Sequence, residues 1–152
     1  MSEMTVSDVM SHPVISVPAH TDLERVAQIM LEKEIGSLVV VDDEGAMIGI
    51  VTDADFAAHK SMIPFSTFEL PQVLGQWMDD DGIEEIYRKA RSTEVREIMT
   101  RSVCSVEKDA PIEEVVRLML DHDIDHVPVM DGDRAVGMVA HRDLLKLLRG
   151  SA

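Results

Sequence analysis

The segment Gly49-Ile50-Val51-Thr52-Asp53-Ala54-Asp55 returns, with substitutions, as Gly137-Met138-Val139-Ala140-His141-Arg142-Asp143. Each copy runs from a glycine through apolar residues into a polar stretch that ends in aspartate. This pattern is typical of a strand that leads into a helix. A segment that returns in such a form indicates an internal duplication, so the fold depends on how far that duplication extends.

The duplication extends through most of both halves of the chain. At an offset of 89 positions, Val6–Met10 aligns with Val95–Met99, and the strand-like Val14–Val17 aligns with Val103–Val106. A one-residue deletion near Gly132 changes the offset to 88 for the rest of the alignment. Each copy then predicts the element order strand, helix, strand, strand, helix.

Apolar residues at helical spacing predict one long helix in each copy, and both stripes are predicted to face the core. In the first copy, Thr21 and Glu24 have the spacing of a capping box. In the second, Asp109 and Pro111 form a plausible cap and first turn. The first stripe is Leu23, Val26, Ala27, Met30 and Leu31, and the second is Ile112, Val115, Val116, Met119 and Leu120.

Continuous apolar runs predict strands that are buried on both faces. Leu38–Val41 is such a run, it ends at the turn-forming Asp42–Gly45, and its counterpart is Val127–Met130. Ile48–Val51 and Val136–Val139 supply a further strand in each copy. A single unit of roughly 50 residues buries too little surface to be stable alone, so we expect the two copies to pack sheet to sheet.

The predicted fold class is therefore α/β (α+β): two βαββα repeats related by a pseudo-twofold axis, joined by a helical connection. The first repeat covers residues 1–60, the connecting insertion residues 61–92, and the second repeat residues 93–152. Within the insertion, Leu70–Met78 and Ile83–Ala90 are the predicted helical parts. Clefts between two such repeats are suitable places for a small ligand.

Composition narrows the function classes. The 14 basic and 29 acidic residues give a net charge of −15, which disfavours binding to nucleic acid or to a membrane surface. Cys104 is the single cysteine and cannot form an internal disulfide. The opening residues do not resemble a secretion signal, and no apolar run approaches the roughly 20 residues of a membrane span. We therefore expect a cytoplasmic protein.

The most specific local signal is Thr52 followed three residues later by Asp55, at a strand-to-helix junction. A threonine hydroxyl and free backbone N–H groups there can hold a phosphate oxygen, and the aspartate can accept two ribose hydroxyls. A structural interpretation is equally open, in which Thr52 caps the helix and Asp55 favours its first turn.

Taken together, these motifs resemble the cystathionine-β-synthase (CBS) domain, twice over, across residues 4–60 and 93–149. The D-V-M and E-I-M openings, the P-V-I-S-V and S-V-C-S-V strands, the G-S-L-V-V-V-D and D-H-V-P-V-M-D segments and the G-h-x-T-x-x-D ending occur in order. The resemblance implies a βαββα fold in each repeat, head-to-tail packing and assembly into homodimers. It also implies AMP, ADP, ATP or S-adenosylmethionine as the ligand.

Carried over by position, the resemblance predicts a first cleft in which Thr52 meets phosphate and Asp55 holds ribose. Ile15 and Ser37 would line its base pocket. The second cleft would use Asp143 for ribose and Arg142 for phosphate, and its wall would consist of Cys104, His126 and Pro128.

The second copy departs from the family pattern at Ala140, where a threonine or serine is usual. One hydroxyl is therefore missing. Arg142 could compensate through a charge-assisted contact, or the second cleft could prefer another ligand or stay empty.

Other chemistries have weaker support. His122 and His126 have an i, i+4 spacing, but the helix is predicted to end between them, and we expect no metal site. Cys104 aligns with Ile15 in an apolar strand, which indicates a buried structural thiol rather than a nucleophile. No catalytic motif is present, so we expect no catalytic residues.

The leading hypothesis is a regulatory module that senses an adenine nucleotide or adenosyl compound and signals to a separate, unidentified partner. The alternative is a structural or interaction protein with vestigial clefts, whose central helices, carrying Trp77 and Tyr87, form the working surface. A third class, a nucleotide hydrolase, lacks an identifiable base.

Overall fold

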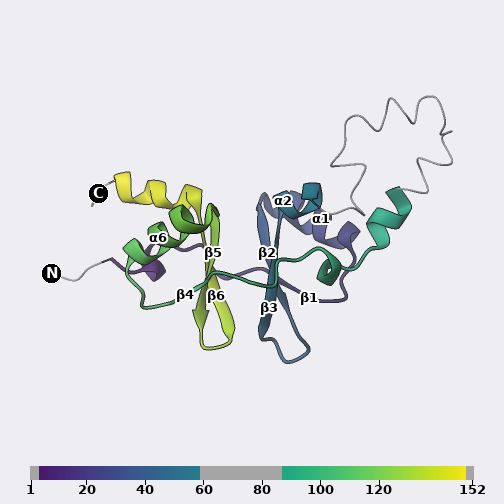
Figure 1. The fold of residues 1–152 in the computed structure, drawn as a ribbon, viewed down its shortest axis with the longest axis horizontal. Helices are drawn as coiled ribbons and strands as arrows, with labels where there is room; N and C mark the ends of the chain where they lie inside the picture. Colours follow the sequence, from purple (N-terminus) through teal and green to yellow (C-terminus); the bar gives the residue numbers. More distant parts are fainter. Residues whose placement is uncertain (1–3, 59–86, 150–152) are drawn as a thin grey trace.

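A computed structural model describes residues 4–58 and 87–149 of the chain (Figure 1). The predicted βαββα order is present in both repeats, each preceded by a short 3₁₀ turn. The elements of the first repeat are η1 (Val6–Asp8), β1 (Ser16–Pro18), α1 (Leu23–Lys33), β2 (Ser37–Val41), β3 (Met47–Thr52) and α2 (Asp53–Ala58). Those of the second are η3 (Val95–Glu97), β4 (Val106–Glu107), α6 (Ile112–His122), β5 (His126–Asp131), β6 (Arg134–Ala140) and η4 (His141–Arg149).

Each repeat forms its own three-stranded mixed sheet. The strand orders are β1-β2-β3 and β4-β5-β6, and in each sheet the first pair is parallel and the second antiparallel. Figure 1 shows the two sheets facing each other at the centre of the molecule, with α1 and α2 outside one and α6 and η4 outside the other. The predicted sheet-to-sheet packing is therefore confirmed.

Side chains along the central strands point alternately to the two faces of the sheet, so the core consists of separate layers. In β2, Leu38 and Val40 belong to the cluster that packs against α1, whereas Val39 belongs to the cluster between the two sheets. Successive strand residues point to opposite faces, and both faces of β2 are covered. This explains why the Leu38–Val41 run is continuous rather than alternating, as the sequence predicted.

Two segments leave their own repeat and pack on the other. These crossing segments are residues 5–11 and 94–100. Val6 and Val9 are fully buried among core residues of the second repeat, and Val95 is fully buried among those of the first. Backbone hydrogen bonds fix both, from Val6 N to the Ala110 oxygen (2.9 Å) and from Val95 N to the Thr21 oxygen (2.7 Å). The cores of the two repeats are thus completed by exchange.

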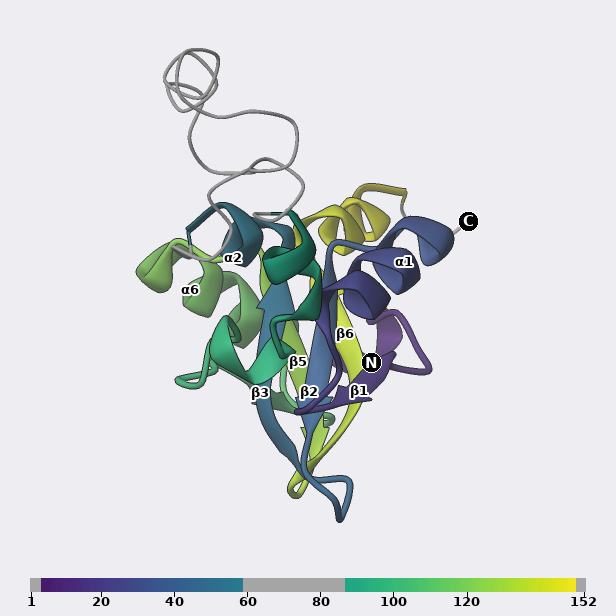
Figure 2. The same ribbon diagram turned by 90° about the vertical axis from the view of Figure 1, so that its right-hand side faces the viewer.

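The ends of the crossing segments also join the opposite sheets. Ser11 exchanges backbone hydrogen bonds of 2.8 and 3.0 Å with Met138 in β6, and Thr100 exchanges bonds of 2.7 and 3.0 Å with Ile50 in β3. Figure 1 shows chain segments crossing between the two sheets, and Figure 2, viewed along the long axis of Figure 1, shows one sheet in front of the other.

This close approach explains the glycines of the repeated motif. A Cβ atom on Gly49 would lie 2.8 Å from the backbone oxygen of Thr100 and 2.7 Å from the sulfur of Met99. A Cβ on Gly137 would meet the sulfur of Met10 and lie 3.1 Å from the Ser11 oxygen. Glycine is therefore required where each crossing segment passes over the strand.

The helix termini differ from the predicted ones. Asp22, not Thr21, caps α1, because its side chain accepts the Arg25 N–H at 2.9 Å. Pro111 occupies the N-cap position of α6, and no side chain bonds there, so the predicted cap at Asp109 is wrong.

Two residues of the predicted core stripes lie on the outside. Leu31 on α1 is 79% exposed and Leu120 on α6 is 78% exposed, although both follow the helical spacing of their buried neighbours. They occupy equivalent places in the two repeats and leave a leucine exposed on each long helix.

Parts of the prediction fall beyond the described residues. The predicted helix at Leu70–Met78 and Trp77 lie there, while the second predicted helix is described from Tyr87 onward, and residues 87–92 are helical. Within the described ranges, no helix has both the length and the apolar character needed to cross a membrane.

Gly49→Ala is expected to destabilise the fold by about 1–3 kcal/mol, because the added methyl group forces the crossing segment away from β3. Urea unfolding of the purified variant measures this loss. Ser105→Ala, at an exposed position, serves as the control and should change stability by less than about 0.5 kcal/mol. Equal stability of both variants would contradict the close approach.

Candidate functional site

A cavity of about 750 Å³ lies between the two repeats. Residues from both repeats line it, including the segment that follows the first crossing segment, the end of α1, the start of β2, and the junction of β6 with η4. The lining residues are Ser11, Pro13, Val14, Ile15, Glu34, Ile35, Gly36, Ser37, His126, Met138, Ala140, Arg142, Asp143, Leu145 and Lys146.

The residues that line this cavity come from both of the clefts that the sequence analysis predicted. Ile15 and Ser37, predicted to accompany Asp55, instead share the cavity with Arg142 and Asp143 of the second repeat. The crossing segments are the reason. Residues 5–11 pack on the second repeat, so the chain reaches Ile15 from beside the end of β6. Of the predicted second-cleft set, His126 also lines this cavity.

The other predicted site residues lie outside the lining of this cavity. Thr52 and Asp55 occupy the equivalent junction of β3 with α2 in the first repeat. Pro128 is buried in β5, where it pairs with Met138 of β6. Cys104 is a free, half-buried thiol, less enclosed than predicted.

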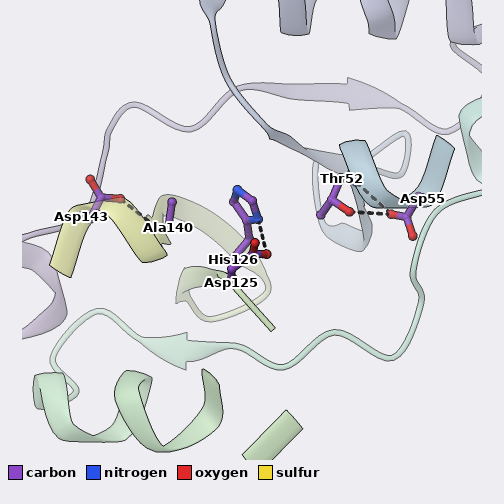
Figure 3. Close-up of polar contacts among 6 residues, drawn as sticks. All are labelled: Thr52, Asp55, Asp125, His126, Ala140 and Asp143. Carbon is purple, nitrogen blue, oxygen red and sulfur yellow. Dashed lines mark hydrogen bonds and ion pairs between the residues drawn. The ribbon is translucent and has the colours of Figure 1, made fainter. Parts of the chain in front are cut away.

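Asp143 is the most constrained polar group of the cavity. It is buried, and three different elements hold its carboxylate. The Ala140 N–H donates to Oδ2 at 2.8 Å, the Ser11 hydroxyl donates to Oδ1 at 3.2 Å, and the Lys146 ammonium lies 3.0 Å from Oδ1. Figure 3 shows the Asp143–Ala140 contact. The carboxylate is thereby fixed in place before any ligand arrives.

Asp55 has the same backbone geometry in the first repeat. Its Oδ2 accepts the Thr52 N–H at 2.8 Å, and its Oδ1 accepts the Thr100 hydroxyl at 3.2 Å (Figure 3 shows the Thr52–Asp55 pair). Thr100 is the counterpart of Ser11 at the offset of 89. Each aspartate therefore ties a strand end to the crossing segment that covers it, and this structural role exists alongside any role in binding.

Sequence reasoning missed Lys146. Its ammonium donates to the Val9 carbonyl at 2.7 Å as well as contacting Asp143, so it joins η4 to the end of the first crossing segment. The available signal was the i, i+3 spacing from Asp143 on a helical segment, which places the two side chains on one face.

His126 lies at the start of β5, on the wall of the cavity. Its Nδ1 lies 3.0 Å from Asp125 Oδ1 (Figure 3), and α6 ends at His122, as predicted, so the two histidines occupy different elements. In the described part of the chain, no three His, Cys, Asp or Glu side chains gather in a way that could hold a metal ion.

The comparison with known families decides the identity of the fold. The family model of the CBS domain matches the chain twice, over residues 6–61 and 95–150. The chain belongs to the CBS-domain family. The CBS pair formed by its two repeats contains the cavity described above.

Similar proteins support this assignment. Uncharacterized protein MJ1404 of Methanocaldococcus jannaschii is 30% identical over 97% of this chain, and the chain spans only 32% of that relative. The solved CBS domain of a CBS domain containing membrane protein from Sphaerobacter thermophilus has 31% identity and a TM-score of 0.77, covering 95% of this chain and 88% of its own.

A further solved CBS pair carries ligands. The CBS domain pair of protein MJ0100, in complex with 5′-methylthioadenosine and S-adenosyl-L-methionine, has 26% identity and a TM-score of 0.70, covering 99% of this chain and 100% of its own. Two adenosyl compounds are thus bound by a protein with this fold.

A double-mutant cycle on Thr100→Ala and Asp55→Ala is expected to give a coupling energy of about 0.5–1.5 kcal/mol, because one hydrogen bond joins the two side chains. Urea unfolding of both single variants and the double variant measures it. The matched control combines Thr100→Ala with Asp143→Ala, which share no hydrogen bond and should be additive within about 0.5 kcal/mol. Coupling energies of equal size in both cycles would show that the coupling does not come from the hydrogen bond between Thr100 and Asp55.

Proposed function

We propose that this CBS pair is a regulatory module that binds an adenine nucleotide or adenosyl compound in the cavity between its repeats. The observation that carries the proposal is the buried, oriented Asp143 carboxylate in a cavity of about 750 Å³. Volumes of roughly 300–1,000 Å³ suit a small organic ligand. The adenosyl ligands of the MJ0100 pair support the ligand class.

The chemistry of the cavity wall matches the parts of such a ligand. Ile15, Ile35 and Met138 supply an apolar surface for a purine base. Asp143, as an ionised carboxylate, can accept hydrogen bonds from two adjacent ribose hydroxyls. Arg142 is exposed at the cavity and can face the 5′ substituent.

The equivalent residues of the first repeat form a second proposed site. Thr52 and Asp55 would serve there with Cys104, the counterpart of Ile15. Thr52 supplies the hydroxyl that Ala140 lacks, and its side chain already lies 3.4 Å from Asp55.

The proposed output is a change in the crossing segments, which a separate partner protein would detect in the cytoplasm. The Ser11 hydroxyl donates to Asp143, so a ligand that also binds this carboxylate alters a contact to the first crossing segment. Such a ligand acts through its different affinity for the two arrangements.

The proposal includes no catalytic step. Ser37 and His126 share the cavity, yet among the described residues no hydrogen bond joins them, and the ring nitrogen Nδ1 of His126 contacts Asp125. A nucleophile acts with its base within hydrogen-bond reach.

Titration calorimetry with AMP, ADP, ATP and S-adenosylmethionine tests the binding proposal, after denaturation of a sample to detect copurified nucleotide. At least one ligand is expected to bind wild type, and Asp143→Ala is expected to weaken binding in the cavity by about tenfold or more, because charged hydrogen bonds to ribose are lost.

Asp55→Ala is the matched control, since it removes the equivalent carboxylate outside the cavity lining. It should leave binding in the Asp143 cavity unchanged. If no ligand binds to nucleotide-free wild type, the proposal fails and the interaction-protein alternative replaces it.

We further propose a homodimer that uses the outer faces of the long helices. The support is the pair of exposed leucines at equivalent positions, Leu31 on α1 and Leu120 on α6. Burial of such side chains against a second copy removes apolar surface from water.

Light scattering should give wild type twice the mass of one chain, and Leu31→Glu combined with Leu120→Glu should give the mass of one chain. Leu148→Glu, which places the same charge at an exposed leucine of η4, is the control and should remain dimeric. A monomeric wild type, or a double variant that stays dimeric, would refute this interface.

A further inference from the structure

Asp143 and Asp55 accept the same backbone hydrogen bond, at 2.8 Å, but the residues at equivalent positions around them carry different charges. At the offset of 88, Arg142 and Lys146 correspond to Ala54 and Ala58. The cavity at Asp143 is thus lined by two basic residues that the first repeat replaces with alanine.

The set of residues around Asp55 contains more acidic residues than the set around Asp143. The cavity lining contains two acids, Glu34 and Asp143, which balance its two bases. The residues at equivalent positions around Asp55 include Asp123 and Asp125, and they contain no lysine or arginine. The lining set is thus balanced in charge, whereas the set at equivalent positions has three acids and no lysine or arginine.

Lys146 supplies the positive charge next to the buried carboxylate of Asp143. Asp143 is buried, whereas Glu34 and Arg142 are exposed, and solvent screens their charges. The Lys146 ammonium has two fixed partners, the Val9 carbonyl at 2.7 Å and Asp143 Oδ1 at 3.0 Å. The positive charge is therefore held against the buried carboxylate.

The charge state of this pair matters for the ligand. A ribose bound at Asp143 places its 5′ substituent near the same carboxylate. Without a compensating cation, that carboxylate would repel a phosphate and attract a positive group, in a chain with a net charge of −15. With Lys146 in place the repulsion is cancelled. Arg142, which has no acidic partner among the described residues, can then contact an anion.

We propose that Lys146 determines the charge of the ligand that the cavity accepts, so that the Asp143 cavity prefers a 5′-phosphorylated nucleoside over a cationic sulfonium compound. Lys146 acts here as a positioning residue, through Asp143. This inference rests on the proposed function, because it assigns a ligand class to the same cavity.

The test compares AMP with S-adenosylmethionine by calorimetry on wild type and on Lys146→Met, which keeps an apolar stem and removes the charge. Wild type should prefer AMP. In the variant, the ratio of AMP affinity to S-adenosylmethionine affinity should fall by about tenfold, since a unit charge a few ångströms away changes binding by roughly that factor. Lys146→Arg should preserve the wild-type ratio.

Lys108→Met is the matched control. Lys108 also forms a lysine–aspartate pair, with Asp131 at 3.1 Å, and the hydrogen bond in that pair is the main cause that raises the pKa of Lys108. Lys108 is not among the cavity-lining residues. The control changes the net charge equally and should leave the affinity ratio unaltered.

The ratio also separates ligand selection from stability. A variant that is partly unfolded loses apparent affinity for both ligands by the same factor, so the ratio is unaffected. If Lys146→Met does not fold, the salt dependence of wild type gives the answer. AMP affinity should fall between about 0.05 M and about 0.5 M NaCl, while affinity for neutral 5′-methylthioadenosine stays constant.

The outcomes distinguish the two proposals. If both ligands bind and the ratio is the same in Lys146→Met, or if wild type prefers S-adenosylmethionine, the role of Lys146 is refuted and the adenosyl-binding function remains. If neither ligand binds wild type, both proposals fail.

Discussion

The two repeats exchange their crossing segments, and this exchange fixes both the packing of the two cores and the contacts of the two site aspartates. Val6 and Val95 are fully buried in the core of the repeat to which they do not belong. Since the same segments end in Ser11 and Thr100, the exchange also determines what holds the two aspartates. The path of the crossing segments therefore determines both the packing of the core and the geometry of the site.

The pseudo-twofold axis preserves shape more strictly than chemistry. The backbone contacts of Asp55 and Asp143 are equal in length, at 2.8 Å, because both close the same turn at a strand end. The side chains around them are free to differ, since they do not determine that turn. A duplicated fold can in this way offer two sites of one geometry and different electrostatic character.

The repeat, the order of elements along the chain and the buried central strands could be predicted from sequence, because each depends on local patterns of residues. Which residues line the same cavity could not be predicted from sequence. An offset of 89 shows which residues are equivalent, such as Ile15 and Cys104, but not which are neighbours, and only the crossing segments bring Ile15 to Asp143. Periodicity likewise places Leu31 next to buried residues, although nothing in the described part of the chain covers it.

The exchange has a consequence for how the chain acquires its structure during synthesis. Val6 and Val9 find their core partners only in residues such as Val127 and Val139, more than a hundred positions later. Contacts so distant in sequence form slowly, because a long loop must close first. On the ribosome, the first crossing segment must wait until the strands of the second repeat have emerged, and until then its apolar side chains are open to premature association.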